Sequence, residues 1–224
     1  GMVVVRSVSD YAADRPAFLE WTRQLRRVQN SKDVLNWNTD KHYLKELAAM
    51  GLPTIPTNWL EPSQKLTKHQ IHTRFPAFGE FVVKPAVSSG VRDVGRYTTV
   101  DIRQRQAAMR QVQGLLGEGR SVMLQRYVEE IDLHGEISLV FFNGLVSHAV
   151  EKRSALHPAS VTNPEMHEAV LTADSADSVA WTWGEQIRCV LHDYVRARLG
   201  HDEQFLFNRV DLVPDGKGSF LVME

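Results

Sequence analysis

The dipeptide Asn143-Gly144, set between two alternating apolar segments, is the strongest local folding signal in this sequence. Asn-Gly provides the two positive φ angles of the type I′ turn that joins antiparallel strands, so residues 135–152 are predicted to form a hairpin. A second hairpin is predicted from residues 204–213 and 219–224, which flank Pro214-Asp215-Gly216. These hairpins, combined with helical segments elsewhere, favour an α+β architecture with two small sheets.

Apolar periodicity places the remaining elements. Strands are predicted at residues 2–6, 81–84 and 121–128 from short β-branched runs, and residues 52–60 are expected to be extended because two prolines exclude a helix. Helices are predicted at residues 15–28, at 103–116 and at 176–199, with two short helices between residues 30 and 51. The second short helix is expected to begin at Asn38 or Thr39, which places Lys41 in its first turn. Residues 154–176 show no clear period and are predicted to be a loop.

Composition narrows the class of protein. The chain of 224 residues is 43% apolar with a net charge of -1, which fits a globular protein and gives no basic field for nucleic acid. A single cysteine excludes an internal disulfide framework and is typical of a reducing compartment. No apolar run approaches the roughly 20 residues of a transmembrane helix, and the short N-terminal apolar run, which ends at Arg6, leads us to expect no signal peptide. We therefore expect a cytoplasmic protein that does not act on nucleic acids or membranes.

A Ser/Gly-rich loop follows the predicted strand that ends at Lys84. Gly90 and Gly95 have the spacing of a P-loop, but Arg96-Tyr97 follow where Lys and Ser or Thr are required, so a Walker site is excluded. A lysine at the end of a strand and a flexible loop above it can instead hold phosphate through the ammonium, the backbone N–H groups and the serine hydroxyls. The alternative is an ordinary hairpin loop with a solvated lysine.

The segment 204–213 alternates, so Arg209 and Asp211 share one face of a strand with two phenylalanines. Charged groups on such a face are costly unless they are paired or bound to a ligand. Glu224 lies roughly opposite Asp211 on the partner strand of the hairpin. Two carboxylates on adjacent strands are a common way to hold Mg²⁺, which completes its shell with nucleotide oxygens and water. The alternative is an Arg–Asp ion pair on the surface.

Taken in order, these segments resemble the ATP-grasp superfamily, and in particular the glutathione-synthetase-like carboxylate–amine ligases. The resemblance covers about residues 30–224 and is carried by short motifs: Asn38-Thr-Asp-Lys41, Val83-Lys84-Pro85, Leu124-Gln-Arg-Tyr-Val128, Gly135-Glu-Ile-Ser-Leu139 and Arg209-Val-Asp211 with Glu224. It implies an ATP-grasp fold in which two α+β subdomains enclose the nucleotide. The implied domains are residues 1–29 (remnant of a preceding α/β domain), 30–122 (linker and small subdomain) and 123–224 (larger subdomain).

The resemblance also implies roles for individual residues. Lys41 and Lys84 would contact the α- and β-phosphates of ATP, and a lid over residues 87–96, which includes Ser88, Ser89 and Gly90, would cover the triphosphate. The adenine would be bound by the strand Gln125, Arg126, Tyr127 and Val128, and the ribose by Glu136, with Asp132 as a substitute. Asp211 and Glu224 would bind Mg²⁺, Arg209 would face the transferred phosphate, and Lys152 and Arg153 would contact the substrate.

The implied reaction is ATP- and Mg²⁺-dependent activation of a small carboxylate as an acyl phosphate, followed by attack of an amine or another nucleophile. Family members continue beyond the position of Glu224 to a second metal ligand and carry a domain before the first strand. The sequence is therefore interpreted as truncated at both ends, and the chain alone is expected to bind nucleotide weakly and to have little ligase activity. A nucleotide-binding module without catalysis, or an inactive fragment of such a ligase, remains the alternative. The substrate and the oligomeric state are open.

Overall fold

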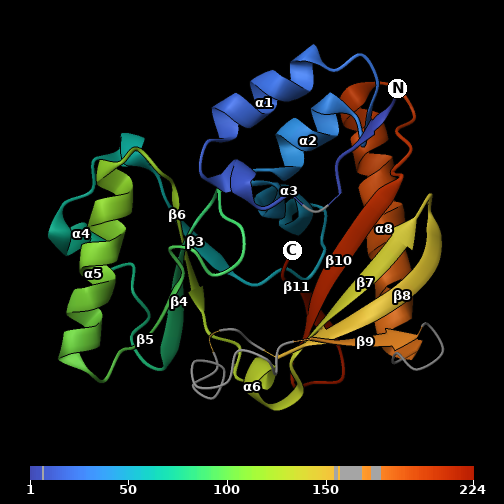
Figure 1. Cartoon of the computed structure of the whole chain (residues 1–224). Coiled ribbons are helices and arrows are strands. Elements are labelled where there is room, and N and C mark those ends of the chain that lie inside the picture. The colour runs from blue at the N-terminus through green and yellow to red at the C-terminus, as the bar shows by residue number, and fades with distance from the viewer. Residues whose placement is uncertain (7, 154–155, 157–167, 173–177) are drawn as a thin grey trace. The chain divides into compact units, whose positions relative to one another are not determined.

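The computed structural model in Figure 1 describes the whole chain except residues 7, 154–155, 157–167 and 173–177. It divides into two compact units, which are considered separately: unit 1 comprises Gly1–Thr54 and Glu129–Glu224, and unit 2 comprises Ile55–Val128. The mixture of helices with antiparallel sheets confirms the predicted α+β class.

Unit 1 is built on a five-stranded antiparallel sheet with the strand order β11-β10-β7-β8-β9. Its strands are β7 (Glu136–Phe142), β8 (Leu145–Lys152), β9 (Glu168–Thr172), β10 (Phe207–Pro214) and β11 (Phe220–Val222). Strands β7 and β8 form the hairpin predicted around Asn143-Gly144, and both turn residues have positive φ (52° and 78°). The predicted hairpin of β10 and β11 is confirmed as well.

Helices α6 (Glu130–His134) and α8 (Ser178–Leu199) pack against strand β10 of this sheet, and the described part of unit 1 contains three further helices. They are α1 (Arg15–Gln24), α2 (Lys32–Asn38) and α3 (Tyr43–Ala49), together with a 3₁₀ turn η1 (Asp10–Ala12). The two strands β1 (Val3–Val4) and β2 (Val28–Gln29) pair in parallel as a small separate sheet. Helix α8 approaches β7 closely at Gly184, where an added Cβ atom would lie 2.4 Å from Leu139 Cδ1.

Three sequence predictions in unit 1 were wrong. The helix predicted at residues 15–28 ends at Gln24, and Val28 lies in strand β2. Lys41 does not lie in a helix, because Thr39 ends α2 and α3 begins only after His42. The carboxylate of Asp40 accepts the backbone N–H of His42 at 3.1 Å, which stabilises the turn between the two helices. The predicted loop 154–176 lies partly outside the described residues, but it contains the edge strand β9, which pairs with β8 over five positions.

Unit 2 contains a four-stranded sheet with the order β3-β6-β4-β5. The strands are β3 (Thr57–Leu60), β4 (Glu80–Pro85), β5 (Gly95–Thr98) and β6 (Val122–Arg126), and the helices are α4 (Lys68–His72), α5 (Ile102–Gly117) and the 3₁₀ turn η2 (Pro62–Gln64). The core between sheet and helices is formed by fully buried side chains, among them Leu60, Phe81, Val83, Val112 and Val122. Strand β6 pairs with β3 and β4, so it belongs to this unit, whereas the sequence placed it at the start of the larger subdomain.

Candidate active site

One face of the unit 1 sheet carries most of the predicted functional side chains of that unit. On β10, Asp211 lies directly opposite Ser138 of β7, and Arg209 lies opposite Val140. On β8, Lys152 lies opposite Glu136 of β7. Directly paired residues project to the same side of an antiparallel sheet, and so do residues two apart along one strand. The strand register therefore brings Arg209, Asp211, Glu136 and Lys152 to one face.

The backbone brings Asp211 and Glu224 together at the end of the second hairpin. The backbone N–H of Asp211 donates to the carbonyl of Glu224, and the N–H of Met223 donates to the carbonyl of Asp211, both at 2.8 Å. Two residues of the terminal segment thus face one residue of β10, which is the arrangement of a β-bulge. A bulge redirects the side chains that follow it, so Glu224 lies beside Asp211, where the register of Leu212 with Val222 would place Met223 alone.

Both carboxylates are held by predicted phosphate-binding cations. Arg209 forms two hydrogen bonds to Asp211, from Nε at 2.8 Å and from a terminal guanidinium nitrogen at 2.7 Å. Lys41 Nζ lies 3.3 Å from Glu224 Oε1, and the Lys41 side chain is almost completely buried. Burial would lower the pKa of Arg209, but the charge of Asp211 and its hydrogen bonds outweigh this effect and raise it. Arg209 therefore stays a cation at every relevant pH.

Glu136 is the titrating group of this face. Burial and the negative charges of Asp211 and Glu224 raise the pKa of its carboxyl group to about 7, against the opposing effect of Lys152 and Arg209. A carboxyl group that is half protonated near neutral pH can both donate and accept hydrogen bonds. This property suits the predicted contact with ribose hydroxyls, which have the same dual character.

Two tyrosines border the same carboxylates, and the sequence assigned a role to neither of them. Burial and the charges of Glu224 and Asp211 raise the pKa of Tyr43 well above its usual value. Burial and Glu224 likewise raise the pKa of Tyr11, which lies in η1. Tyr11 stands in a short polar segment with no periodicity, so no local signal could have connected it with residues some 200 positions away. Both phenols stay protonated and remain hydrogen-bond donors.

In unit 2, Lys84 occupies the position predicted for a strand-borne phosphate contact. It lies on β4, and only 7% of the residue is exposed. Ser88 is also buried, and its hydroxyl donates to the carbonyl of Pro85 at 3.1 Å. Gly90 has a φ of +62°, which an L-residue rarely adopts, so the glycine is required by the turn itself. Of the three predicted lid residues, Ser89 is half-buried and Gly90 is exposed, so both are accessible, whereas Ser88 is not.

The predicted lid ends earlier than the sequence suggested. Gly95 and Arg96 belong to β5 and pair with Val83 and Val82 of β4. The guanidinium of Arg96 binds the carboxylate of Glu80, with Nε at 3.0 Å, and stacks over the ring of Tyr127 at 3.6 Å. Arg96 therefore has a structural role in the sheet, which leaves residues 87–94 as the loop proper.

The predicted adenine-binding residues form the C-terminal end of β6 and the two residues that follow it. Gln125 is buried and donates from Nε2 to Thr57 Oγ1 at 2.8 Å across the sheet. The Tyr127 N–H donates to the Glu80 carbonyl at 2.9 Å, and Arg126 stacks over Phe78 at 4.5 Å. The side chains of Gln125, Arg126 and Tyr127 thus have partners within unit 2, and a nucleobase would have to be bound by backbone groups at this strand end and at Val128.

A hard divalent cation fits the donor set of unit 1. Asp211 and Glu224 offer carboxylate oxygens, the ligands that Mg²⁺ prefers, and Mg²⁺ needs one or two of them when nucleotide oxygens complete its shell. Within the described part of the chain, three or more His, Cys, Asp or Glu side chains nowhere gather closely enough to hold a metal ion alone. The arrangement fits a metal that arrives with a nucleotide better than a resident metal ion.

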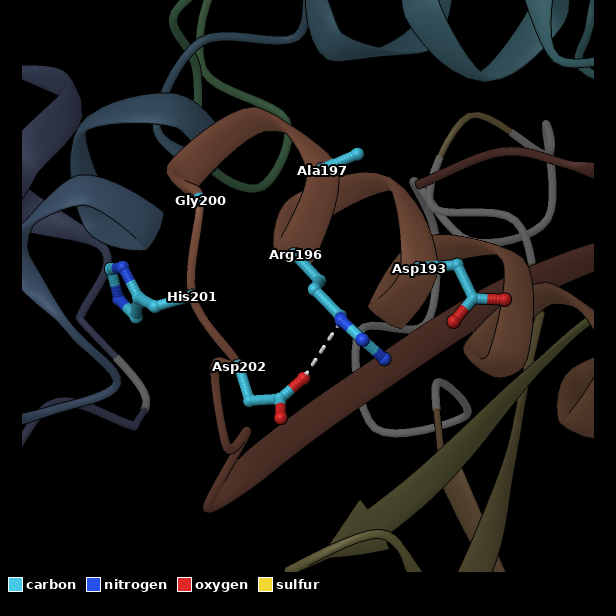
Figure 2. Close-up of a pocket in the computed structure, with 6 residues that line it drawn as sticks. All are labelled: Asp193, Arg196, Ala197, Gly200, His201 and Asp202. Atoms are coloured by element: carbon cyan, nitrogen blue, oxygen red, sulfur yellow. Dashed lines mark ion pairs between the residues drawn. The ribbon is translucent and has the colours of Figure 1, made fainter.

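The remaining predicted substrate contacts lie at the end of β8. Lys152 is half-buried beside Glu136, whereas Arg153 is exposed and immediately precedes residues that the structure does not describe. An open depression at the end of α8 is a separate surface feature (Figure 2), lined by Asp193, Arg196, Ala197, Gly200, His201 and Asp202. The ion pair between two of these residues, Arg196–Asp202 at 3.2 Å, is mostly exposed and therefore contributes little to stability. The depression contains no predicted site residue.

Comparison with known proteins identifies the class. The chain is 35% identical over 228 residues to the cycloserine biosynthesis protein DcsG of Streptomyces lavendulae. This match covers 99% of the present chain and 73% of DcsG. The crystal structure of D-cycloserine synthetase DcsG matches the whole chain with a TM-score of 0.78 at 33% identity and 74% coverage of its own length. No family model matches the sequence.

More distant structures have the same fold. A D-alanine–D-alanine ligase from Bacillus anthracis matches all of this chain and 68% of its own with a TM-score of 0.66 at 15% identity. The same enzyme complexed with ATP matches 88% of this chain and 56% of its own with a TM-score of 0.59 at 15% identity.

The fold and the relatives define a carboxylate–amine ligase of the ATP-grasp superfamily, as the sequence motifs predicted. Within this superfamily the chain belongs to the family of the cycloserine biosynthesis protein DcsG. It is thus an ATP-dependent, amide-forming ligase by family. None of the helices in the described ranges is long and apolar enough to cross a lipid bilayer.

Proposed function

We propose that this protein is an ATP- and Mg²⁺-dependent ligase that activates the carboxylate of a small D-amino acid or its derivative for attack by an amine or a related nucleophile. The observation that carries the proposal is the four-residue charge cluster of unit 1: Lys41, Arg209, Asp211 and Glu224. In this cluster each of two cations is paired with a carboxylate at one face of the sheet. When MgATP binds, the carboxylates can exchange their cations for Mg²⁺, and the cations can exchange their carboxylates for phosphate.

Each residue has a proposed role. Lys41 in unit 1 and Lys84 in unit 2 bind phosphate oxygens of one ATP molecule, as the family resemblance implies, and the loop 87–94 covers them through backbone N–H groups. Asp211 and Glu224 hold Mg²⁺, which when bound neutralises phosphate charge. Arg209 forms a bidentate contact with the transferred phosphate, because its planar fork fits phosphate as well as it fits Asp211. Glu136 binds the ribose hydroxyls, Gln125 to Val128 the adenine edge, and Lys152 and Arg153 the carboxylate substrate.

The chemistry proceeds in two transfers. A substrate carboxylate oxygen attacks the γ-phosphorus of ATP, the bond to the β-phosphate oxygen breaks, and ADP leaves. The nucleophilic nitrogen then attacks the acyl carbon, loses a proton, and inorganic phosphate departs as the amide forms. The protein mainly supplies position and electrostatic stabilisation, because phosphoryl transfer needs little covalent help. Exclusion of water by the loop protects the acyl phosphate from hydrolysis.

The proposed substrate class rests on the names of the relatives. D-Cycloserine synthetase and D-alanine–D-alanine ligase are both named after compounds of the D configuration. We infer that this protein also selects a D-configured amino-acid carboxylate, and that it is a cytoplasmic enzyme whose partners are small molecules.

The test is a stereochemically matched scan. Purified protein is incubated with MgATP and the D or the L form of each candidate amino acid, with hydroxylamine as a general nucleophile, and ADP and hydroxamate are measured. The proposal predicts that ADP is released only when an amino acid is added, and faster with the D form than with the L form. The Lys84→Ala variant should lose this release. Nucleotide binding without acceptor-dependent ADP release would instead support a non-catalytic binding module.

A further inference from the structure

The hydroxyl of Ser138 has no partner in the interior of unit 1. Ser138 is completely buried, and its Oγ atom is one of two buried side-chain polar atoms without a hydrogen bond in the described part of the chain. A buried hydroxyl without a partner is costly, and native structures contain few of them, so each one calls for an explanation. Ser138 lies within β7 between the apolar residues Ile137 and Leu139.

The immediate neighbour of this hydroxyl is the candidate metal ligand Asp211. The two residues are directly paired between β7 and β10, so their side chains share one face of the sheet. In such pairs the Cβ atoms lie about 4.5–5.5 Å apart, which is within reach of a hydrogen bond between a serine hydroxyl and an aspartate oxygen.

Arg209 explains why this hydrogen bond is not made. Its fork occupies both oxygens of Asp211, at 2.8 and 2.7 Å, and thereby turns the carboxylate along its own strand, toward the residue two positions earlier. A carboxylate can accept about four hydrogen bonds or metal contacts. When Arg209 turns to a phosphate, Asp211 loses both hydrogen bonds from the guanidinium. A carboxylate oxygen of Asp211 that does not bind the metal then needs another hydrogen-bond donor.

We propose that Ser138 is the positioning residue that holds Asp211 in its metal-binding orientation after Arg209 has turned to the phosphate. This inference rests on the proposed function. In the ligand-free state Arg209 orients the carboxylate and the Ser138 hydroxyl is idle. In the nucleotide-bound state the hydroxyl would donate to an oxygen of Asp211, and Asp211 would then be oriented to hold Mg²⁺ together with Glu224. Donors behind a metal ligand commonly change metal affinity about 10- to 100-fold.

Four forms of the full chain test this role: wild type, Ser138→Ala, Ser138→Thr and Ser138→Val. Threonine and valine have the same shape, so they differ in the hydroxyl group alone. The first readout is the urea midpoint of unfolding without metal or nucleotide. The Ser138→Ala midpoint should equal or exceed that of wild type, because no hydrogen bond is lost. A clear decrease would show that the hydroxyl already has a structural partner, and would overturn the proposal.

The second readout is binding of Mn²⁺, used as a paramagnetic probe for Mg²⁺, in the presence of a non-hydrolysable ATP analogue. Ser138→Ala and Ser138→Val should bind Mn²⁺ about 10-fold more weakly than wild type, and Ser138→Thr should bind as wild type does. Equal affinity in all four proteins would overturn the role of Ser138 and leave the proposed function intact. Absence of Mn²⁺–nucleotide binding in wild type itself would contradict the proposed function, and with it this inference.

Discussion

Lys41 Nζ and Glu224 Oε1 lie 3.3 Å apart, so a lysine assigned to phosphate is held by a carboxylate assigned to the metal. The second pair, Arg209 with Asp211, repeats this relationship on the neighbouring strand. Breaking either pair by removing one partner leaves a poorly solvated charge, whereas MgATP replaces both partners together. In the ligand-free site each cation is therefore neutralised by a carboxylate of the protein. Binding of the metal and binding of the nucleotide should be strongly coupled, because each releases the partner of the other.

Replacement of Lys41 by methionine tests this coupling. The variant should bind the nucleotide about 10- to 100-fold more weakly, because a charge-assisted contact to phosphate is lost. Without nucleotide it should bind Mn²⁺ more tightly than wild type, because Glu224 is released. Isothermal titration and Mn²⁺ resonance measure the two affinities, with Lys45→Met on the exposed side of α3 as the charge-matched control. If Lys41→Met bound both the nucleotide and Mn²⁺ more weakly than wild type, the proposed exchange of partners between Lys41 and Glu224 would be contradicted.

Arg209→Lys keeps the positive charge and removes the planar fork. We expect kcat to fall about 100-fold, with a much smaller change in the KM for ATP, because the fork is assigned to charge that develops during transfer. Steady-state kinetics separate the two parameters. Arg23→Lys, at an exposed position of α1, is the control and should leave both unchanged. A rise in KM at constant kcat would instead assign Arg209 to ground-state binding.

The acid stability of unit 1 should depend on Glu46. Burial would raise the pKa of this carboxyl, but hydrogen bonds from Tyr194 and Trp37 and the charge of Arg198 outweigh it and lower the pKa below 4.5. A depressed pKa contributes stability above the unfolded-state value and loses it as the pH falls through the folded-state value. Glu46→Gln should therefore lower the free energy of unfolding at pH 7 by about 1 kcal/mol and reduce its acid dependence.

Urea unfolding between pH 3 and 7 measures this contribution. Glu20→Gln on α1 removes a similar carboxylate from an exposed ion pair, so it should change stability by less than about 0.5 kcal/mol. An unchanged slope of stability against pH in Glu46→Gln would show that another carboxylate is responsible.

Two helical glycines should respond oppositely to alanine. A Cβ atom at Gly184 would lie 2.4 Å from Leu139 Cδ1 in the core, whereas at Gly114 on α5 it would meet nothing within 4 Å. Gly184→Ala should destabilise by about 1–3 kcal/mol through overpacking, and Gly114→Ala should stabilise by up to about 1 kcal/mol through helix propensity. Chemical denaturation measures both. A stabilised Gly184→Ala protein would contradict the close packing of α8 on β7.

The features that could be predicted from the sequence are those that depend on residues close together in the chain. The hairpin at Asn143-Gly144 depends on two neighbouring residues, and the alternation around Arg209 and Asp211 correctly placed both on one face. The pairings that balance the site depend on contacts between distant segments, and Lys41 with Glu224 is an example. The edge strand β9 pairs through its backbone and has no side-chain signature that distinguishes it from a loop. Ser138 looked like any polar residue in a strand, because an unpartnered hydroxyl is recognised only after packing.

The most direct test of the proposed mechanism follows an oxygen atom. Protein, MgATP and nucleophile are supplied with D-amino acids that carry ¹⁸O in the carboxylate, and the released phosphate is analysed by mass spectrometry. Activation as an acyl phosphate transfers one carboxylate oxygen to each phosphate, so the account predicts singly labelled phosphate together with ADP. Unlabelled phosphate, or release of AMP and pyrophosphate, would contradict it.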